Sequence, residues 1–166
     1  MCYDISFMVS MRQLSDYFPD LIFDQQMDID FESTVHIMGH SYGQHPIIYR
    51  HQEDKKLHCQ LMEWGCIPFY VKDVKAYTKQ RASMLNARSE RILGDTKSYW
   101  NKIRNRRCLI PVSAIYEHRK IVKWTKKVPY FIKPKDQELF FLPGLYSAVE
   151  VADTETGEMI KTFTFT

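Results

Sequence analysis

The second residue, Cys2, directly follows the initiator methionine. A side chain of this size normally lets an aminopeptidase remove Met1, which would leave Cys2 with a free α-amine beside its thiol. An α-amine titrates near ~7.7–8.0 and a thiol near ~8.5, so both groups hold a usable fraction of their nucleophilic form at neutral pH. Such a 1,2-aminothiol captures an aldehyde twice, first as a Schiff base and then through the thiol, which closes a thiazolidine ring. Taken alone, a Met-Cys start is more often an incidental feature of a frayed terminus.

A single carboxyl group stands in the most basic part of the chain. From Lys97 to Lys127 there are ten Lys and Arg residues and one acid, Glu117, whereas the segments before and after are mildly acidic. A basic centre between acidic ends predicts a groove for a polyanion, or alternatively a solvated basic surface without a ligand. Glu117 follows an apolar run, LIPVSAIY, which is typical of a strand. There its carboxyl group could exchange protons with a substrate, or it could form a structural salt bridge. The residues alone favour the salt bridge.

Aromatic and arginine side chains supply candidates for binding bases and phosphates. Trp64, Phe69 and Tyr70 flank a Gly-Cys-Ile-Pro turn, where flat rings could stack on bases, although aromatics at such a spacing are more often core residues. We expect Trp64 to be buried and Phe69 or Tyr70 to meet a nucleic acid. The candidates for phosphate contacts, as a group, are Arg81, Arg104, Arg106 and Arg107.

The histidines give little support for a metal site. His36 and His40 have the spacing of one helical turn, and His45, His51 and His58 lie nearby in the sequence. The pattern shows no partnering Cys or acid at ligand spacing. We therefore expect chance surface histidines, no metal and no cofactor, since aldehyde capture needs none.

The elements that would position these residues are mostly strands. Residues 10–23 predict a short amphipathic helix that breaks near Pro19, and residues 71–85 and 94–105 predict further short helices or helical turns. From Thr34 onward, runs rich in β-branched and aromatic residues alternate with Gly, Pro and charged clusters, as strands do; these runs are HPIIYR, CQLMEWGCIPFY, RCLIPVSAIYEH, VPYFIKP, LFFLPGLYSAVEV and MIKTFTFT. The pattern predicts one α+β, β-rich domain with a curved or partly closed barrel-like sheet and short helices.

Length and composition fit a single domain over residues 1–166. With 45% hydrophobic and 14% aromatic residues, the chain is long enough for one core and short for two. No apolar run reaches the ~18–20 residues of a membrane span, and the N-terminus lacks the layout of a secretory signal. The four cysteines form no CxxC pair. We expect a cytoplasmic, monomeric protein with reduced thiols, associated with the nucleoid when it is bound to DNA.

Several stretches behind the Met-Cys start occur in an order that matches one family. They are WGCIPFY (64–70), NARSE (86–90), RRCLIPVSAIYEH (106–118) and PGLYSA (143–148), and HPIIYR (45–50) resembles the early strand of the same family. Together they resemble the SOS response-associated peptidase (SRAP) family, whose members covalently trap abasic sites in single-stranded DNA. The resemblance covers essentially the whole chain, and its specificity lies in the ordered set of motifs.

The resemblance implies a role for each residue of the candidate site. It implies that Cys2 is the nucleophile, that Glu117 exchanges protons, and that Asn86 positions the amine or the sugar oxygen through hydrogen bonds. It also implies that Arg88 contacts the DNA backbone, which a guanidinium can hold through two hydrogen bonds. The residues alone leave open a capped turn with a surface salt bridge to Glu90.

The chain departs from the family pattern at three places. Tyr3 and Asp4 stand where the family commonly has Gly-Arg, and Phe69 and Tyr70 stand where the tryptophan-glycine motif often ends in a second tryptophan. The family also carries a functional histidine in a His-x-Arg-Met-Pro stretch after the strand that KTFTFT resembles, whereas the last histidine here is His118. We therefore expect the domain to be incomplete at its C-terminus, with that histidine unassigned.

These observations lead to one principal hypothesis and two alternatives. The principal hypothesis is covalent capture of abasic sites in single-stranded DNA through Cys2, as a thiazolidine crosslink in the DNA damage response. The first alternative is an N-terminal-cysteine peptidase, which needs an oxyanion hole that no motif reveals. The second is a noncatalytic single-stranded DNA-binding module, for which charge and aromatic residues suffice. The sequence leaves open whether the chain acts as an enzyme, as a lyase or a hydrolase.

Overall fold

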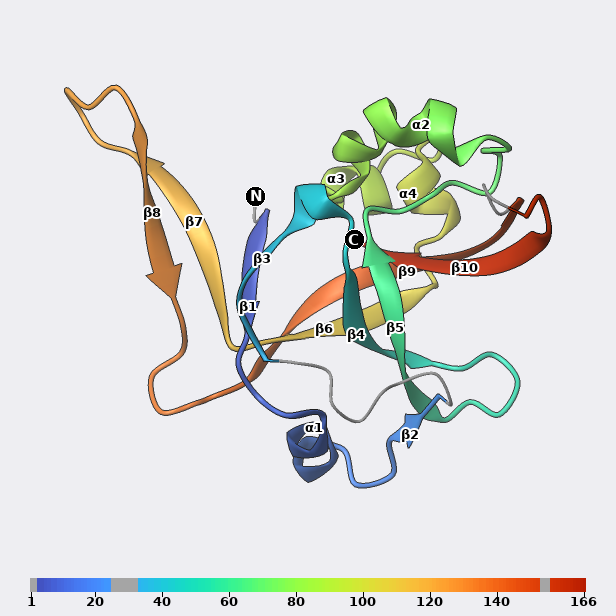
Figure 1. The fold of residues 1–166 in the computed structure, drawn as a ribbon, viewed down its shortest axis with the longest axis horizontal. Coiled ribbons are helices and arrows are strands. Elements are labelled where there is room, and N and C mark those ends of the chain that lie inside the picture. The colour runs from blue at the N-terminus through green and yellow to red at the C-terminus, as the bar shows by residue number, and fades with distance from the viewer. Residues whose placement is uncertain (1–2, 25–32, 153–155) are drawn as a thin grey trace.

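The computed structural model describes residues 3–24, 33–152 and 156–166, and it has two β-sheets with short helices (Figure 1). The strands are β1 (Asp4–Phe7), β2 (Ile22–Phe23), β3 (Thr34–Met38), β4 (Gln44–Arg50), β5 (Leu57–Trp64), β6 (Arg107–Val112), β7 (Ala114–Lys120), β8 (Lys127–Ile132), β9 (Phe140–Ala152) and β10 (Met159–Phe165). A four-stranded sheet has the order β3-β1-β7-β8, and a six-stranded sheet has the order β10-β9-β6-β4-β5-β2. This arrangement confirms the predicted α+β, β-rich class.

The six-stranded sheet closes on itself through β10. The end of β10 pairs in parallel with the end of β5, with Thr164 opposite Glu63 and Phe165 opposite Trp64. One residue after β5, the Gly65 N–H donates to the Phe165 carbonyl over 2.8 Å. Because β10 also pairs along its length with β9, the strands β5, β4, β6, β9 and β10 form a ring. The predicted barrel-like sheet is confirmed.

Two glycines allow the ring to close. Gly65 has a φ of +95°, a left-handed conformation that residues with a side chain rarely adopt. Its carbonyl accepts a hydrogen bond from Arg81 Nε at 2.8 Å. At Gly144 in β9, an added Cβ would lie 2.5 Å from the Thr166 carbonyl oxygen. That carbonyl accepts from the Leu145 N–H at 3.0 Å, so the close approach of the two backbones depends on the missing side chain.

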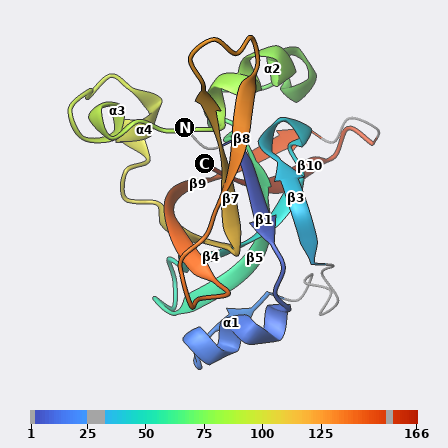
Figure 2. The ribbon, with the colours of Figure 1, turned by 90° about the vertical axis from the view of Figure 1, so that its left-hand side faces the viewer.

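The four-stranded sheet continues directly from the ring. One residue, Ser113, separates β6 from β7, and its N–H donates to the Ser6 carbonyl at 2.7 Å, which holds β1 against this corner. β7 and β8 then form an antiparallel hairpin that projects from the body of the molecule (Figure 1, Figure 2). The start of the chain therefore lies between the ring and this hairpin.

Apolar side chains from both sheets form the core. The largest buried cluster draws on β1 and on all strands of the ring, and consists of Ile5, Ile47, Tyr49, Met62, Trp64, Leu85, Cys108, Ile110, Val112, Tyr146 and Phe165. A second cluster packs the first helix against the ring with Phe7, Val9, Met11, Leu14, Leu21, Ile48, Cys59 and Leu139. A third covers the segment after β5 with Cys66, Met84, Tyr99, Trp100, Ile103 and Leu145. Each of these three clusters includes side chains from strands of the ring.

The predicted helices are confirmed, but each is shorter than its sequence window. They are α1 (Met11–Tyr17), α2 (Val74–Arg81) with the 3₁₀ turn η2 (Ala82–Met84), and α4 (Tyr99–Lys102). Two further elements have no counterpart among the predictions, α3 (Ser89–Leu93) and the 3₁₀ turn η1 (Gly39–Ser41). The longest helix in the described part of the chain, α2, has eight residues, and none of the described helices is long and apolar enough to cross a membrane.

β10 differs from the half-buried strand that the alternation in KTFTFT predicts. Thr164 and Phe165 are both fully buried, although consecutive side chains point to opposite faces, whereas the first residues of β10 are exposed. The difference arises because both faces of the end of β10 are covered. Phe165 lies in the main core, whereas Thr164 Oγ1 accepts from the Ile67 N–H at 3.1 Å, in the segment that follows β5.

Candidate functional site

The start of the chain lies beside the strand that carries Glu117. In the antiparallel pair of β1 and β7, Ile5 lies opposite Ile115. Extending this register by two residues brings Tyr3 beside Glu117, on the same sheet face as Ile5 and Ile115 because side chains alternate along a strand. Tyr3 and Glu117 are both half-buried, and Tyr3 packs against the main core. The predicted nucleophile, Cys2, lies outside the described residues.

Asn86 follows a segment that is held against the ring. Trp64 Nε1 donates to the Leu85 carbonyl at 3.0 Å, and the Cys66 N–H donates to the Met84 carbonyl at 3.2 Å. The Nδ2 atom of Asn86 is buried, and no hydrogen-bond partner for it occurs among the described residues. Leaving a buried donor unsatisfied costs about 1–3 kcal/mol. Asn86 is therefore a fixed polar group that is available to bind a ligand.

Asn86 lines two adjoining cavities. The larger, of about 570 Å³, lies at the end of the ring, and its wall includes Trp64, Ile110, Leu142 and Phe165. The smaller, of about 270 Å³, is lined by Tyr3, Ala82, Ser83, Asn86, Arg88, Arg91 and Trp100. The larger cavity offers mainly apolar surface, and the smaller one places positive charge beside the start of the chain.

Four exposed arginines border these cavities. Arg88 and Arg91 line the smaller cavity, and Arg104 and Arg107 line the larger one. Arg106, by contrast, is half-buried and directs its guanidinium at a backbone carbonyl 3.5 Å away. Exposed guanidinium groups around an opening are suited to phosphate oxygens. The sequence analysis missed Arg91, because α3, which carries it to the wall of the smaller cavity, has no counterpart among the predicted helices.

Arg81 has a structural role in place of the expected phosphate contact. Its side chain is 8% exposed, and Nη2 lies 2.6 Å from Glu63 Oε2. Nε donates to the Gly65 carbonyl, and the guanidinium lies over the ring of Tyr42, 4.7 Å from its centroid. The guanidinium is thus occupied by protein groups that support the turn at Gly65. The sequence of a short helix with several basic residues does not show which of them points toward the body of the molecule, so the buried position of Arg81 could not be predicted.

The three aromatic candidates occupy different environments. Trp64 is 5% exposed and stacks on Phe165 with 5.7 Å between ring centroids, so it walls the larger cavity and offers no exposed platform for a base. Phe69 and Tyr70 are 60% and 59% exposed. Lys102 Nζ lies 6.0 Å from the centroid of the Phe69 ring. Exposed rings beside a positive charge are the combination that single-stranded nucleic acids bind.

The β7–β8 hairpin carries exposed aromatic side chains that the sequence analysis did not single out, beside basic residues of the 97–127 segment. Trp124, in its turn, is 59% exposed, and Phe131 on β8 is 46% exposed. The basic residues of the hairpin are Arg119, Lys120, Lys123, Lys126 and Lys127. From the sequence alone, Trp124 among its neighbouring lysines is indistinguishable from an ordinary solvent-exposed turn. Only the projection of the hairpin beside β1 shows that it adjoins the start of the chain (Figure 2).

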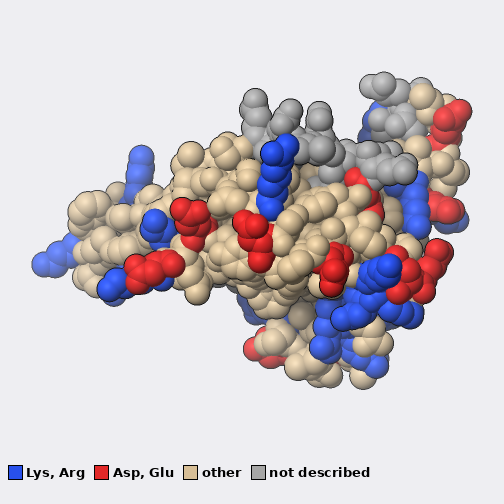
Figure 3. Space-filling model, turned by 90° about the horizontal axis from the view of Figure 1, so that it is seen from below, with Lys and Arg blue, Asp and Glu red and all other residues tan. Residues whose placement is uncertain are grey.

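The face of the molecule on the side of α1 does not share the excess of arginines found around the cavities. Seen from below, on the side of α1, Lys and Arg are interspersed with Asp and Glu (Figure 3). A mixed surface of this kind does not offer a continuous path for a polyanion. The cavity arginines and the hairpin are therefore the better candidates for a nucleic-acid interface.

The three described cysteines are poor nucleophiles. Cys59, Cys66 and Cys108 are all buried and unpaired by disulfides. Burial raises the pKa of the Cys59 and Cys66 thiols to about 12, and it also raises the pKa of the Cys108 thiol. These thiols are protonated at neutral pH, and the thiolate is the reactive form. Reaction with an aldehyde is therefore disfavoured at all three.

His36 and His40 do not share a helix. His36 lies on β3 with its Nε2 atom 3.0 Å from Asp4 Oδ1, whereas His40 lies in η1. His45 is fully buried in β4, and its Nε2 donates to the Pro111 carbonyl at 2.7 Å. Burial lowers the pKa of His45 to about 4, so the ring is neutral at physiological pH. These three histidines occupy separate places and form no common site among the described residues.

Comparisons with known proteins agree on one family. A family model described as SOS response associated peptidase (SRAP) matches residues 1–166. An abasic site processing protein of Saccharomyces cerevisiae is 37% identical over 101 residues, which cover 61% of this chain and 26% of that protein. The abasic site processing protein YoqW of Bacillus subtilis is 36% identical over 103 residues, which cover 62% of this chain and 42% of that protein. The match thus spans less than half the length of these relatives.

Solved structures share the fold. A protein from Bacteroides thetaiotaomicron has a TM-score of 0.72 and 26% identity, covering 99% of this chain and 66% of that one. A protein from Bordetella bronchiseptica has a TM-score of 0.68 and 21% identity, covering 98% of this chain and 70% of that one. The ring and its companion sheet therefore recur in experimentally determined structures.

Proposed function

The chain belongs to the SOS response-associated peptidase family, whose model covers residues 1–166, and from this premise we propose that it captures abasic sites in single-stranded DNA covalently through Cys2. The relatives that it matches are named abasic site processing proteins. The observation that carries the proposal is the Nδ2 group of Asn86, buried without a partner among the described residues where two cavities meet. Four arginines line the same two cavities, and Tyr3, which the register of β1 and β7 brings beside Glu117, lines the smaller one.

The proposed reaction joins an aldehyde to the Cys2 aminothiol. The abasic sugar opens to its aldehyde, and the Cys2 amine adds to C1′ to give a carbinolamine. Loss of one water molecule gives a Schiff base. The Cys2 thiolate then adds to the same carbon while the nitrogen takes up a proton, which closes the thiazolidine ring. New C1′–N and C1′–S bonds form, and neither partner is oxidised or reduced.

Glu117 and Asn86 would perform different parts of this reaction. Glu117 exchanges protons with the sugar oxygen during ring opening and with the hydroxyl that leaves as water. General acid–base catalysis of this kind contributes about 10²–10⁴-fold. Asn86 donates a hydrogen bond that fixes the reacting atoms. The half-buried position of Glu117 beside Tyr3 and the unsatisfied donor of Asn86 among the described residues support these roles.

The DNA strand would be held by charge and by stacking. The cavity arginines, Arg88, Arg91, Arg104 and Arg107, contact phosphates, since all four are exposed. Phe69 and Tyr70 stack on bases next to the lesion, which requires unpaired bases and so favours a single strand over a duplex. The basic β7–β8 hairpin extends the same surface.

A denaturing gel tests the covalent step. The protein without Met1 is incubated with a single-stranded oligonucleotide that carries one abasic site, beside an undamaged strand. Cys2→Ser removes the thiol, and Cys59→Ala is the matched control because its thiol is buried. We expect the wild type and Cys59→Ala to give a shifted band with the strand that carries the abasic site and no band with the undamaged strand. Cys2→Ser should give no shifted band with either strand. An equal band from Cys2→Ser or from the undamaged strand would refute capture through Cys2.

The proton-transfer role has its own test. Glu117→Gln should slow crosslink formation by about 10²-fold or more and leave binding on a native gel unchanged. Glu150→Gln, the same substitution at an exposed position of β9, should not change the rate. Equal rates for the two variants would remove Glu117 from the chemistry. Binding without a crosslink in the wild type itself would favour the noncatalytic binding module.

A further inference from the structure

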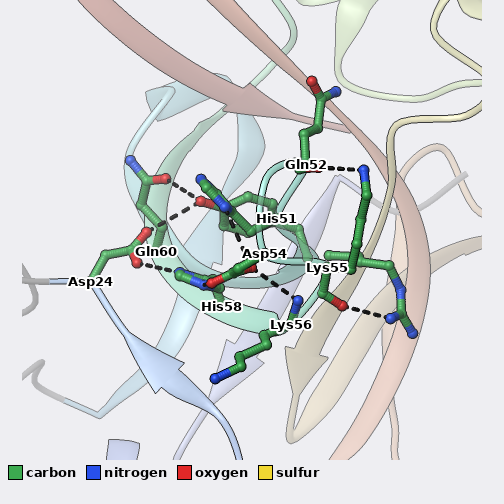
Figure 4. A network of polar contacts seen from close by, with 10 residues as sticks. Asp24, His51, Gln52, Asp54, Lys55, Lys56, His58 and Gln60 are labelled. Carbon is green, nitrogen blue, oxygen red and sulfur yellow. Dashed lines mark hydrogen bonds and ion pairs between the residues drawn. The ribbon is translucent and has the colours of Figure 1, made fainter.

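The β4–β5 hairpin gathers two histidines and two carboxylates that the proposed function does not use (Figure 4). They are His51 and Asp54 near the turn, His58 on β5, and Asp24, which follows β2 directly. We propose that this cluster binds one divalent transition-metal ion of the zinc type. Its turn lies on the side of the molecule away from the β7–β8 hairpin (Figure 1), so this inference is independent of the proposed function.

Three side chains supply ligand atoms at short range. One ligand atom from each of His51, Asp54 and His58 lies within 4.8 Å of the other two. His58 Nε2 is 2.9 Å from Asp54 Oδ2, and His51 Nδ1 is 3.5 Å from Asp54 Oδ1. Ligand atoms at ~2.0–2.2 Å from a tetrahedral Zn²⁺ ion stand about 3.4 Å apart. The separations in the turn lie on both sides of this value, so a small rearrangement of the three side chains makes room for an ion.

Asp24 orients the ring of His58. Asp24 Oδ1 lies 2.7 Å from His58 Nδ1, while Asp54 is bonded to the other ring nitrogen. Histidines that bind metals almost always donate their second N–H to a carboxylate, carbonyl or water, which fixes the tautomer and leaves the other nitrogen for the ion. Asp24 is itself held, because the Tyr49 hydroxyl donates to its Oδ2 atom at 3.2 Å. The orientation that a metal requires of His58 thus exists before an ion binds.

His51 offers a nitrogen that forms no hydrogen bond. Its Nδ1 atom is buried and has no hydrogen-bond partner among the described residues, although its side chain is 33% exposed. Its ring stacks on that of His58 with 4.6 Å between centroids. A metal ion would satisfy this nitrogen. Because the ring is also partly open to solvent, an ion can reach it.

The donor set selects the class of metal. Two imidazole nitrogens and one carboxylate oxygen suit zinc and its neighbours, whereas calcium and magnesium prefer oxygen ligands throughout. Two neutral imidazoles with Asp54 and Asp24 carry a charge of −2, which a divalent ion neutralises. The sequence analysis weighed His36 and His40 instead and passed over Asp54, which lies between His51 and His58 in the sequence. What the fold adds is Asp24, which comes from the segment after β2.

Calorimetric titration of the metal-free protein with zinc chloride tests the proposal. The titration uses Cys2→Ser as its background, because the N-terminal aminothiol could itself bind zinc. We expect one Zn²⁺ ion per chain. Asp24→Asn, which removes the carboxylate that orients His58 and keeps an oxygen that can accept from the Tyr49 hydroxyl, should weaken binding by about 10–100-fold. His118→Ala is the matched control, since His118 is exposed and lies outside the cluster, and it should bind zinc like the background protein.

His51→Ala gives the decisive comparison. This variant removes a ligand whose Nδ1 atom forms no hydrogen bond to the described residues and meets Asp54 Oδ1 only at 3.5 Å, so the metal-free protein should keep its circular dichroism spectrum and melting temperature. We expect it to lose zinc binding and the rise in melting temperature that zinc gives the background protein. The ligand-field absorption of added Co²⁺ should disappear with it. Absence of zinc binding to the background protein in molar excess of metal, or unchanged affinity in both His51→Ala and Asp24→Asn, would overturn the proposal.

Discussion

Acidification should weaken the fold through one buried side chain, His45. This residue is fully buried and contacts the rings of Phe7 and Phe165, and its Nδ1 atom has no hydrogen-bond partner among the described residues. Burial lowers the pKa of His45 from 6.5 to about 4, because the charged ring would be desolvated. The folded protein therefore keeps His45 neutral at pH values where the unfolded chain protonates it.

The direction and size of the effect follow from this difference in pKa. Between pH 6.5 and about 4 the unfolded chain binds more protons than the folded protein, so the free energy of unfolding falls as the pH falls. At ~1.4 kcal/mol per pKa unit the loss is about 3 kcal/mol, complete below about pH 4. His58 acts in the opposite direction: although desolvation lowers its pKa, its bonds to Asp24 and Asp54 outweigh that effect and raise it. Comparison with a variant is therefore needed to isolate His45.

Urea unfolding over a series of pH values measures this loss in the wild type, His45→Gln and His118→Gln. Glutamine keeps a nitrogen that can donate to the Pro111 carbonyl but does not titrate, and His118 is an exposed control. From about pH 6.5 to about 4, the wild type and His118→Gln should lose about 3 kcal/mol more than His45→Gln. Parallel curves for the wild type and His45→Gln would refute the reasoning. A ring pKa near 6.5 for His45 by nitrogen NMR would refute it as well.

Three further substitutions test the ring and the proposed interface. Gly144→Ala should lower the free energy of unfolding in urea by more than ~2 kcal/mol, because its Cβ would lie 2.5 Å from the Thr166 carbonyl oxygen; a wild-type value would contradict that approach. Arg88→Ala should reduce the slope of log affinity for single-stranded DNA against log salt by about 0.7, measured by fluorescence anisotropy, while Arg12→Ala on α1 should not, and equal slopes would argue against a phosphate contact. Trp124→Ala should weaken the same binding by about 1–3 kcal/mol without changing urea stability, and unchanged affinity would exclude the hairpin from the interface.

The positions of most strands could be predicted because their sequences combine β-branched residues with Gly and Pro boundaries. The run HPIIYR became β4, and the end of the chain became β10. The burial of Trp64 and the exposure of Phe69 also agree with what the sequence analysis expected of them. Strand positions and the burial of single side chains depend mainly on nearby residues, and sequence patterns can therefore predict them.

Properties that depend on contacts between distant segments could not be predicted. Arg81 is basic and helical, yet its guanidinium pairs with Glu63 across the turn at Gly65. His58 is bonded to Asp24, which lies far from it in the sequence. The full burial of Thr164 requires the segment after β5, where the Ile67 N–H donates to its Oγ1 atom. In each case the deciding neighbour comes from another element, which periodicity does not identify.

The parallel contact between β5 and β10 also has a consequence for synthesis of the protein. Glu63 and Thr164, which lie opposite each other, are separated by most of the chain. On the ribosome β5 emerges long before β10, so the nascent sheet has an unpaired edge until translation reaches its closing strand. Such edges attract other strands, and pairing between distant segments is slow. The newly made chain therefore passes through an interval in which the edge of β5 that later pairs with β10 is open to other strands.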